Sequence, residues 1–196
     1  TTAESHHRVM ICEVMGRGAG WIALESGIAG SADVILLPEM PYDINKIAEK
    51  VKEREAAGRR FSIVVVAEGA KPKDGEVVVA KIVADSPDPI RLGGIGNKLA
   101  EDLEKLLPDK EIRCTVLGHI QRGGITSTYD RILSTRYGVG AVELINEGKF
   151  GDMVCLKDGK MSSDSLENVI GQKSKLVDPD GELVKVAKKI GISFAD

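Results

Sequence analysis

Three short segments combine glycines with charged or amide side chains in a way that suits the binding of an anion. They read Met15-Gly16-Arg17-Gly18-Ala19-Gly20, then Glu68-Gly69, then Gly118-His119-Ile120-Gln121-Arg122-Gly123-Gly124. Glycines let backbone amides approach a phosphate closely, and an arginine offers a planar fork that bonds two of its oxygens. A carboxylate such as Glu68 can accept hydrogen bonds from sugar hydroxyls. These residue types favour a phosphate site, although a glycine turn alone can also serve tight packing.

Each segment directly follows a stretch that is typical of a β-strand. We predict strands at residues 8–14, 34–37, 62–67 and 113–117, and helices at residues 18–30, 43–56, 96–107, 129–147 and 182–190. Residues 153–161 read as a hairpin that turns at Asp158-Gly159. Alternating strands and helices predict an α/β fold, a mainly parallel sheet sandwiched by helices. In such sheets ligands bind outside the carboxyl ends of the strands, where the three segments lie.

Arg113 begins the predicted strand that ends just before His119. It therefore lies at the opposite end of the sheet and cannot easily share a site with His119 inside one subunit. A single histidine is most often a structural residue, but the position of His119 near Arg122 favours a role in binding.

A rival interpretation starts from Gly18, Gly20 and Ala23, which match the G-x-G-x-x-A turn of dinucleotide-binding proteins. Glu39 lies near the distance at which such proteins contact a ribose. This reading predicts an NAD-binding oxidoreductase domain. It leaves the His119–Arg122 segment without a role, and glycines that merely allow close strand–helix packing explain the turn equally well.

Composition narrows the classes of protein to which the chain can belong. The chain has 196 residues, a net charge of −3 and no apolar run long enough to span a bilayer, so we expect neither a nucleic-acid nor a membrane partner. Cys12, Cys114 and Cys155 are widely spaced, which favours reduced thiols in a cytoplasmic protein. His6 and His7 lack further ligands at metal-binding spacing.

The alternation of predicted strands and helices is interrupted between residues 69 and 95. There we expect an insertion or lid with a short strand near residues 77–83. The chain starts at Thr1, without an initiator Met, and a buried-looking strand follows at once. We therefore expect a piece of a longer protein.

Taken together and in this order, the strand ends resemble the 6-phosphofructokinases. The matching stretches are SHHR (residues 5–8), EVMGRGAGWIAL (13–24), LLPEMPYD (36–43), VVVAEG (64–69), TVLGHIQRGG (115–124) and YDRILSTRYG (129–138). The resemblance covers most of the chain to about residue 150 and then fades.

The resemblance implies a phosphotransferase of glycolysis that converts fructose 6-phosphate to fructose 1,6-bisphosphate. The residues that would hold fructose 6-phosphate are Met15, Gly16, Arg17, Glu68, His119, Ile120, Gln121 and Arg122. Glu68 would contact the sugar, and His119 and Arg122 the phosphate. Arg8 and Arg113 would reach into a neighbouring subunit's site, which implies a homodimer or homotetramer with shared sites.

The resemblance also implies what this stretch lacks. The family's donor loop, its Mg²⁺-handling aspartate and its catalytic base precede the matching region, so we expect no catalytic residue and no metal ligand here. Gly20-Trp21 and the insertion ending in Gly93-Gly94 slightly favour pyrophosphate over ATP as the phosphoryl donor. The tail from about residue 150 is expected to pack on a missing N-terminal domain. A non-catalytic sugar-phosphate regulatory half is a further alternative.

Overall fold

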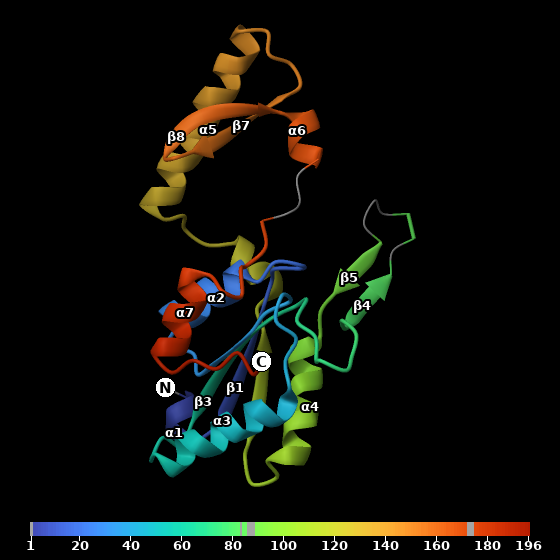
Figure 1. Cartoon of the computed structure of the whole chain (residues 1–196), viewed down its shortest axis with the longest axis vertical. Coiled ribbons are helices and arrows are strands. Elements are labelled where there is room, and N and C mark those ends of the chain that lie inside the picture. Colours follow the sequence, from blue (N-terminus) through green and yellow to red (C-terminus); the bar gives the residue numbers. More distant parts are fainter. Residues whose placement is uncertain (1, 83, 86–88, 172–174) are drawn as a thin grey trace. The chain divides into compact units, whose positions relative to one another are not determined.

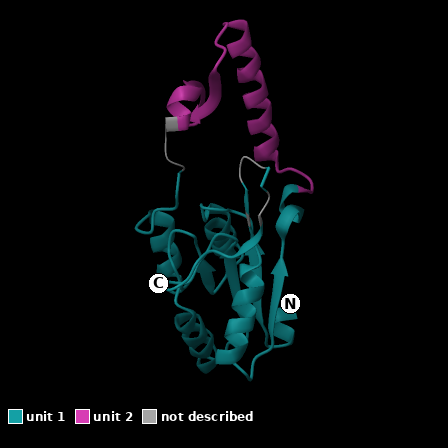
Figure 2. Ribbon diagram, turned by 90° about the vertical axis from the view of Figure 1, so that its right-hand side faces the viewer, with its two compact units in different colours: residues 1–122, 175–196 teal, residues 123–174 magenta. Residues whose placement is uncertain are grey.

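A parallel four-stranded sheet forms the centre of the first of two units (Figures 1 and 2). The computed structural model describes residues 2–82, 84–85, 89–171 and 175–196. Unit 1 comprises Thr1–Arg122 and Lys175–Asp196, and unit 2 comprises Gly123–Ser174. The strand order is β2-β3-β1-β6, with bounds Val34–Leu36, Ser62–Ala67, Val9–Val14 and Ile112–Val116.

The strand register brings the carboxyl ends of β1, β3 and β6 to one edge. Val14 pairs with Ala67 on β3, and Glu13 pairs with Val116 on β6. The segments that follow these three strands therefore begin side by side.

Helices cover both faces of the sheet (Figure 1). On one face, α3 (Ile44–Ala56) and α4 (Ile95–Leu106) pack on β1 and β3 through Ile47, Leu99 and Leu103, all fully buried. On the other, α2 (Trp21–Ala29) and α7 (Glu182–Lys189) pack through Leu24 and Val184. The apolar run of β3 is buried on both faces because helices lie on either side of it.

The stretch that was expected to be an insertion contains an antiparallel pair of strands. β4 (Val79–Ile82) pairs with β5 (Ile90–Leu92), and we call this pair the arm. Sequence reasoning anticipated a strand near residues 77–83 but missed β5. The few residues of β5 carry no alternation that would separate them from a loop.

The last part of the chain returns to unit 1. Val177, Ile192 and Phe194 lie in the core beside α2, and Ser193 forms a parallel bridge with Val34 at the outer edge of β2. Residues 175–196 thus complete the first unit.

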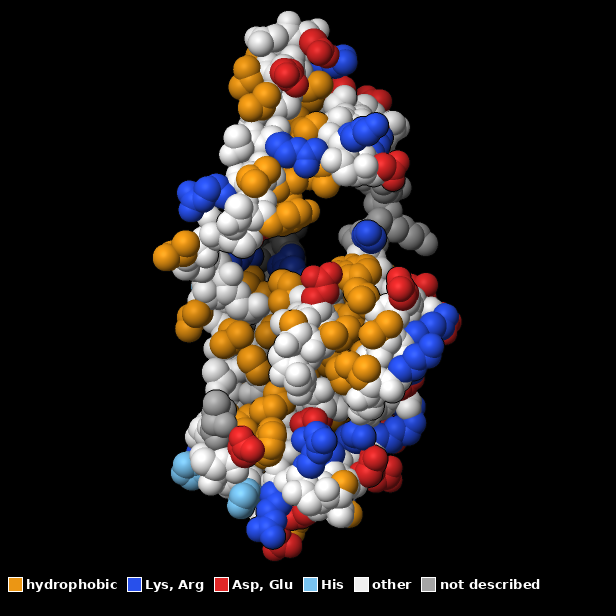
Figure 3. Space-filling model, turned by 90° about the vertical axis from the view of Figure 1, so that its left-hand side faces the viewer, with side chains coloured by type: hydrophobic (Ala, Val, Ile, Leu, Met, Phe, Trp, Pro, Cys, Tyr) orange, Lys and Arg blue, Asp and Glu red, His pale blue; other side chains and the backbone are white. Residues whose placement is uncertain are grey.

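Unit 2 consists of α5 (Thr128–Asn146), the hairpin of β7 (Asp152–Lys157) and β8 (Lys160–Ser165), and α6 (Leu166–Gly171). Asp158 and Gly159 both have positive φ angles, 50° and 75°, as a tight hairpin turn requires. Many of its apolar side chains are exposed, as the face in Figure 3 also shows; they include Ile132, Val139, Val142, Ile145 and Phe150. Only Gly140 is fully buried among the residues of α5.

The predicted fold class, an α/β fold with a parallel sheet between helices, is confirmed. Asp43 caps α3 as expected, because its side chain accepts a hydrogen bond of 2.8 Å from the Asn45 amide. The helix predicted from residue 18 begins only at Trp21. Two short helices, α1 (Thr2–Ser5) and α6, were not anticipated. Among the described residues no helix is long and apolar enough to cross a membrane.

Candidate functional site

Side chains from two strand ends hold the turn that follows β1. The Met15 amide donates to Oε1 of Gln121 at 2.8 Å. The Gly16 and Arg17 amides donate to Oε1 of Glu68 at 3.4 Å and 3.1 Å. The structure therefore brings together five of the residues that sequence reasoning singled out, from segments that follow β1, β3 and β6.

The turn after β1 and the turn after β3 touch through their backbones. A Cβ atom built on Gly69 would lie 1.7 Å from the carbonyl oxygen of Arg17. No side chain fits there, so Gly69 is required for this contact. Arg17 itself has a φ of 44°, a left-handed conformation that the bonds to Glu68 help to hold.

The guanidinium of Arg17 contacts the arm. Its Nη2 donates to the carbonyl oxygen of Ile90 at 3.3 Å. Arg17 is thus linked to β5 by its side chain and to Glu68 by its backbone.

The segment after β6 forms a 3₁₀ turn, η1 (Gly118–Arg122). Gln121 faces the turn after β1, whereas His119, Ile120 and Arg122 are exposed, Ile120 by 78%. Within the described part of the chain, the side chains of His119 and Arg122 make no hydrogen bond or ion pair. Both side chains are therefore open to an external anion.

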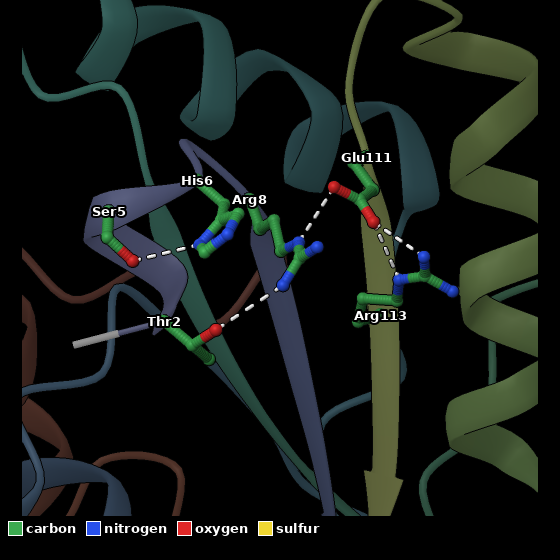
Figure 4. Close-up of polar contacts among 6 residues, drawn as sticks. All are labelled: Thr2, Ser5, His6, Arg8, Glu111 and Arg113. Carbon is green, nitrogen blue, oxygen red and sulfur yellow. Dashed lines mark hydrogen bonds and ion pairs between the residues drawn. The ribbon is translucent and has the colours of Figure 1, made fainter.

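Arg8 and Arg113 lie at the opposite end of the sheet, as the sequence predicts (Figure 4). Arg113 pairs in register with Met10, near the start of β1. Glu111 binds both arginines: its Oε2 accepts from Nε of Arg8 at 2.7 Å, and its Oε1 accepts from Nε and Nη2 of Arg113 at 2.8 Å and 2.6 Å. The hydrogen bonds from Arg8 and then from Arg113 lower the pKa of Glu111 to about 2.

Glu39 has a structural role in place of the ribose contact that the dinucleotide interpretation requires. Its carboxylate accepts from the Gly20 amide at 3.0 Å and 3.2 Å, and from the Val177 amide at 2.8 Å. Glu39 therefore ties the start of α2 to the returning tail. This geometry supports the packing interpretation of the glycine turn.

The described residues do not provide a metal site. In the ranges that the structure covers, no three His, Cys, Asp or Glu side chains gather closely enough to hold an ion.

Sequence reasoning missed three parts of this arrangement: Glu111, the Ile90 carbonyl, and Glu13, whose carboxylate accepts hydrogen bonds from the Gly94 and Gly96 amides. Glu13 left a signal, because it is a charged residue inside the apolar run of β1. Glu111 lies two residues before Arg113 and reads as an ordinary surface charge. A backbone carbonyl such as that of Ile90 leaves no signal in a sequence.

The fold places the chain in the class of open α/β proteins, whose ligand sites lie at the carboxyl edge of the parallel sheet. Residues 1–145 match the family model described as phosphofructokinase. The chain belongs to the phosphofructokinase family.

Curated relatives agree with this assignment. The chain is 79% identical over 196 residues to "ATP-dependent 6-phosphofructokinase 2" of Clostridium perfringens, covering all of this chain and 53% of the relative. It is 50% identical to the "ATP-dependent 6-phosphofructokinase" of Chloroflexus aurantiacus, of which it covers 52%. The chain therefore spans about half the length of the curated relatives it matches.

Solved structures show the same fold. Phosphofructokinase from Saccharomyces cerevisiae matches with a TM-score of 0.69 and 31% identity, over 86% of this chain and 21% of that one. A pyrophosphate-dependent phosphofructokinase from Nitrosospira multiformis matches with a TM-score of 0.72 and 26% identity, over 93% of this chain and 45% of that one.

Proposed function

We propose that this chain is the sugar-phosphate-binding half of a 6-phosphofructokinase, which transfers a phosphoryl group to fructose 6-phosphate in glycolysis. The observation that carries the proposal is the convergence of the turns after β1, β3 and β6 through Glu68 and Gln121. This convergence supports one site built from the residues that the family resemblance implies.

Each residue has a role that its surroundings support. His119 and Arg122 are exposed donors for the 6-phosphate, and Arg17 adds a third donor. Glu68 holds the turn through its Oε1 atom, and the remaining lone pairs of its carboxylate accept hydrogen bonds from sugar hydroxyls. Gln121 fixes Met15 with its oxygen, which leaves its amide group as a donor. The site orients the acceptor sugar, which matters because phosphoryl transfer depends largely on positioning and charge stabilisation.

The phosphoryl donor is ATP. The curated relatives at 79% and 50% identity are both named ATP-dependent. Their names weigh more than the slight preference for pyrophosphate that Gly20-Trp21 and the insertion suggest. The family resemblance assigns Mg²⁺ and the catalytic base to the half of the relatives that this chain does not span.

Arg8 and Arg113 serve a neighbouring subunit, so the functional oligomer is a homodimer or homotetramer. Their location at the amino ends of β1 and β6, away from His119, supports this assignment. Within the stretch after residue 150, unit 2 exposes an apolar surface that suits packing on a further domain.

A chimeric enzyme tests the proposal: this chain replaces the matching half of the Clostridium perfringens relative. We expect it to form fructose 1,6-bisphosphate from fructose 6-phosphate and ATP, with pyrophosphate much the poorer donor. An Arg17→Ala chimera is the matched control and should need far more fructose 6-phosphate. A folded chimera that binds NAD but ignores fructose 6-phosphate would contradict the proposal.

A further inference from the structure

Glu13 is a buried carboxylate whose two oxygens are both used. It lies in β1, is 1% exposed, and accepts the Gly94 amide at 3.0 Å with Oε1 and the Gly96 amide at 2.8 Å with Oε2. A charge in this position costs free energy unless such bonds compensate for it. The carboxylate therefore has a specific task at the start of α4.

That task is to fix the base of the arm. The chain leaves β5 through Gly93 and Gly94, whose φ angles of 144° and 87° favour glycine, and then enters α4. The Gly93 amide donates to the Val78 carbonyl at 3.3 Å, just before β4 begins. The bonds from Glu13 thus hold the point at which the arm joins the body of unit 1 (Figure 1).

The other end of β5 holds Arg17. Ile90, the first residue of β5, accepts a hydrogen bond from Nη2 of Arg17. A path of contacts consequently leads from Glu13 through Gly94 and β5 to the guanidinium of Arg17, only four residues further along the chain from Glu13.

We infer that Glu13 is a positioning residue: through the arm it holds the Arg17 guanidinium in the orientation that receives the sugar phosphate. The inference rests on the proposed function, because Arg17 must contact the substrate. An arginine already held by the Ile90 carbonyl loses less rotamer freedom when it binds a phosphate, so the affinity for the substrate rises.

The test is Glu13→Gln in the chimeric enzyme. Whichever way the new amide turns, its NH₂ group faces the N–H of Gly94 or Gly96, so the base of the arm must shift. We expect the KM for fructose 6-phosphate to rise about tenfold, the value of one hydrogen bond to a charged group, with kcat and the KM for ATP unchanged. An unchanged or lowered KM for fructose 6-phosphate in a folded variant would overturn the inference.

A second variant covers the case in which Glu13→Gln does not fold. Gly94→Ala strains the same junction but leaves the core intact, since its Cβ has nothing nearer than 3.9 Å. Gly191→Ala is its control, with a similar φ of 93° and no atom within 4 Å, at the end of α7. Gly94→Ala should raise the KM for fructose 6-phosphate severalfold, and Gly191→Ala should not. Equal effects of the two variants would refute a specific role of the arm.

A double-mutant cycle identifies Arg17 as the target. In an Arg17→Ala background, Glu13→Gln or Gly94→Ala should raise the KM for fructose 6-phosphate no further, because the group that the arm positions is gone. Additive effects would show that the arm acts elsewhere. If Arg17→Ala alone left the KM for fructose 6-phosphate unchanged, the proposed function would fail, independently of the arm.

Discussion

Arginines at the two ends of the sheet are held in different ways. At the carboxyl edge, Arg122 makes no ion pair with any described residue, whereas Glu111 binds both Arg8 and Arg113 at the amino edge. An anion approaching Arg122 therefore displaces only water. At the amino edge, an incoming phosphate must compete with a carboxylate.

Replacing Arg122 with Ala in the chimeric enzyme should raise the KM for fructose 6-phosphate and leave the KM for ATP nearly unchanged. A charge-assisted contact is worth about 1.5–3 kcal/mol, or one to two powers of ten in affinity. Steady-state kinetics with each substrate varied in turn measures the effect. Lys189→Ala, which removes an exposed charge from α7, is the control for net charge. Equal KM values for the two variants would mean that η1 is only a structural turn.

The contribution of Glu111 to stability should depend on pH. Its pKa in the fold is about 2, below the ordinary 4.5, because Arg8 and Arg113 donate hydrogen bonds to it. A lowered pKa adds stability that is fully present above the unfolded pKa and is lost as the pH falls towards the folded one.

The difference in free energy of unfolding between the wild type and Glu111→Gln should therefore shrink between about pH 4.5 and pH 2. Chemical denaturation of the chimera at several pH values measures it. Glu104→Gln, an exposed carboxylate on α4, provides the comparison. A difference that stays constant down to pH 3 would show that the two arginines do not hold Glu111 in solution.

Residue types and the family resemblance together singled out the residues of the candidate site, since glycines, arginines and Gln121 stand directly after strands. They could not reveal what holds these residues. Gln121 binds the Met15 amide and Ile90 binds Arg17 across long sequence separations, and neither contact alters the local pattern.

At the scale of elements, the candidate site depends on the contact between the turn after β1 and the turn after β3. Gly69 lies so close to Arg17 that the two backbones exclude any side chain. Neither backbone can move without breaking the bonds of Glu68 to the Gly16 and Arg17 amides.

Gly69→Ala should therefore lower the free energy of unfolding by about 2–3 kcal/mol and abolish high affinity for fructose 6-phosphate. Gly18→Ala is a matched control in the same region, because nothing lies within 4 Å of its Cβ. Denaturant titration and substrate kinetics of both variants give the two readouts. If Gly69→Ala behaved like Gly18→Ala, the close approach of the two turns would not exist.

The elements predicted best are those with a strong local pattern. β3 and α3 have the bounds that were predicted. A strand buried on both faces is visible as a run of β-branched residues, and the cap of α3 is visible as an aspartate before the helix. β5 and α6 are short, and tertiary contacts rather than propensity determine them.

At the scale of the whole molecule, this chain alone should not catalyse. Under the proposed function its residues bind and orient a sugar phosphate, and the base and the Mg²⁺ ligands are assigned to the half that it does not span. The isolated chain, with ATP and Mg²⁺ supplied, should show no turnover above a heat-treated control, whereas the chimera should. Measurable activity of the isolated chain would contradict the assignment of the catalytic base to the other half.

Mixed oligomers test whether subunits share sites. Arg113 precedes His119 by six residues along β6 and η1, roughly 17 Å at the rises of a strand and a 3₁₀ turn, too far for one guanidinium. Arg113→Ala and Arg17→Ala chimeras should each lose most of their activity at a low concentration of fructose 6-phosphate. Refolding them together should restore part of the activity, because some sites then receive both wild-type arginines. Mixed oligomers of verified composition that stay as inactive as their parents would make Arg113 a structural residue.

The chain leaves unit 1 after Arg122 and returns to it at Lys175. This interruption affects how unit 1 folds during translation. While unit 2 is being translated, β2 has no Ser193 to cover its outer edge, and the groove for Phe194 beside α2 stays empty. Translation proceeds at about 5–20 residues per second, so the nascent chain exposes this incomplete sheet for several seconds. Closure of the sheet and core of unit 1 is therefore delayed until residues 192–194 have been translated. During that interval the uncovered edge of β2 is a target for a chaperone.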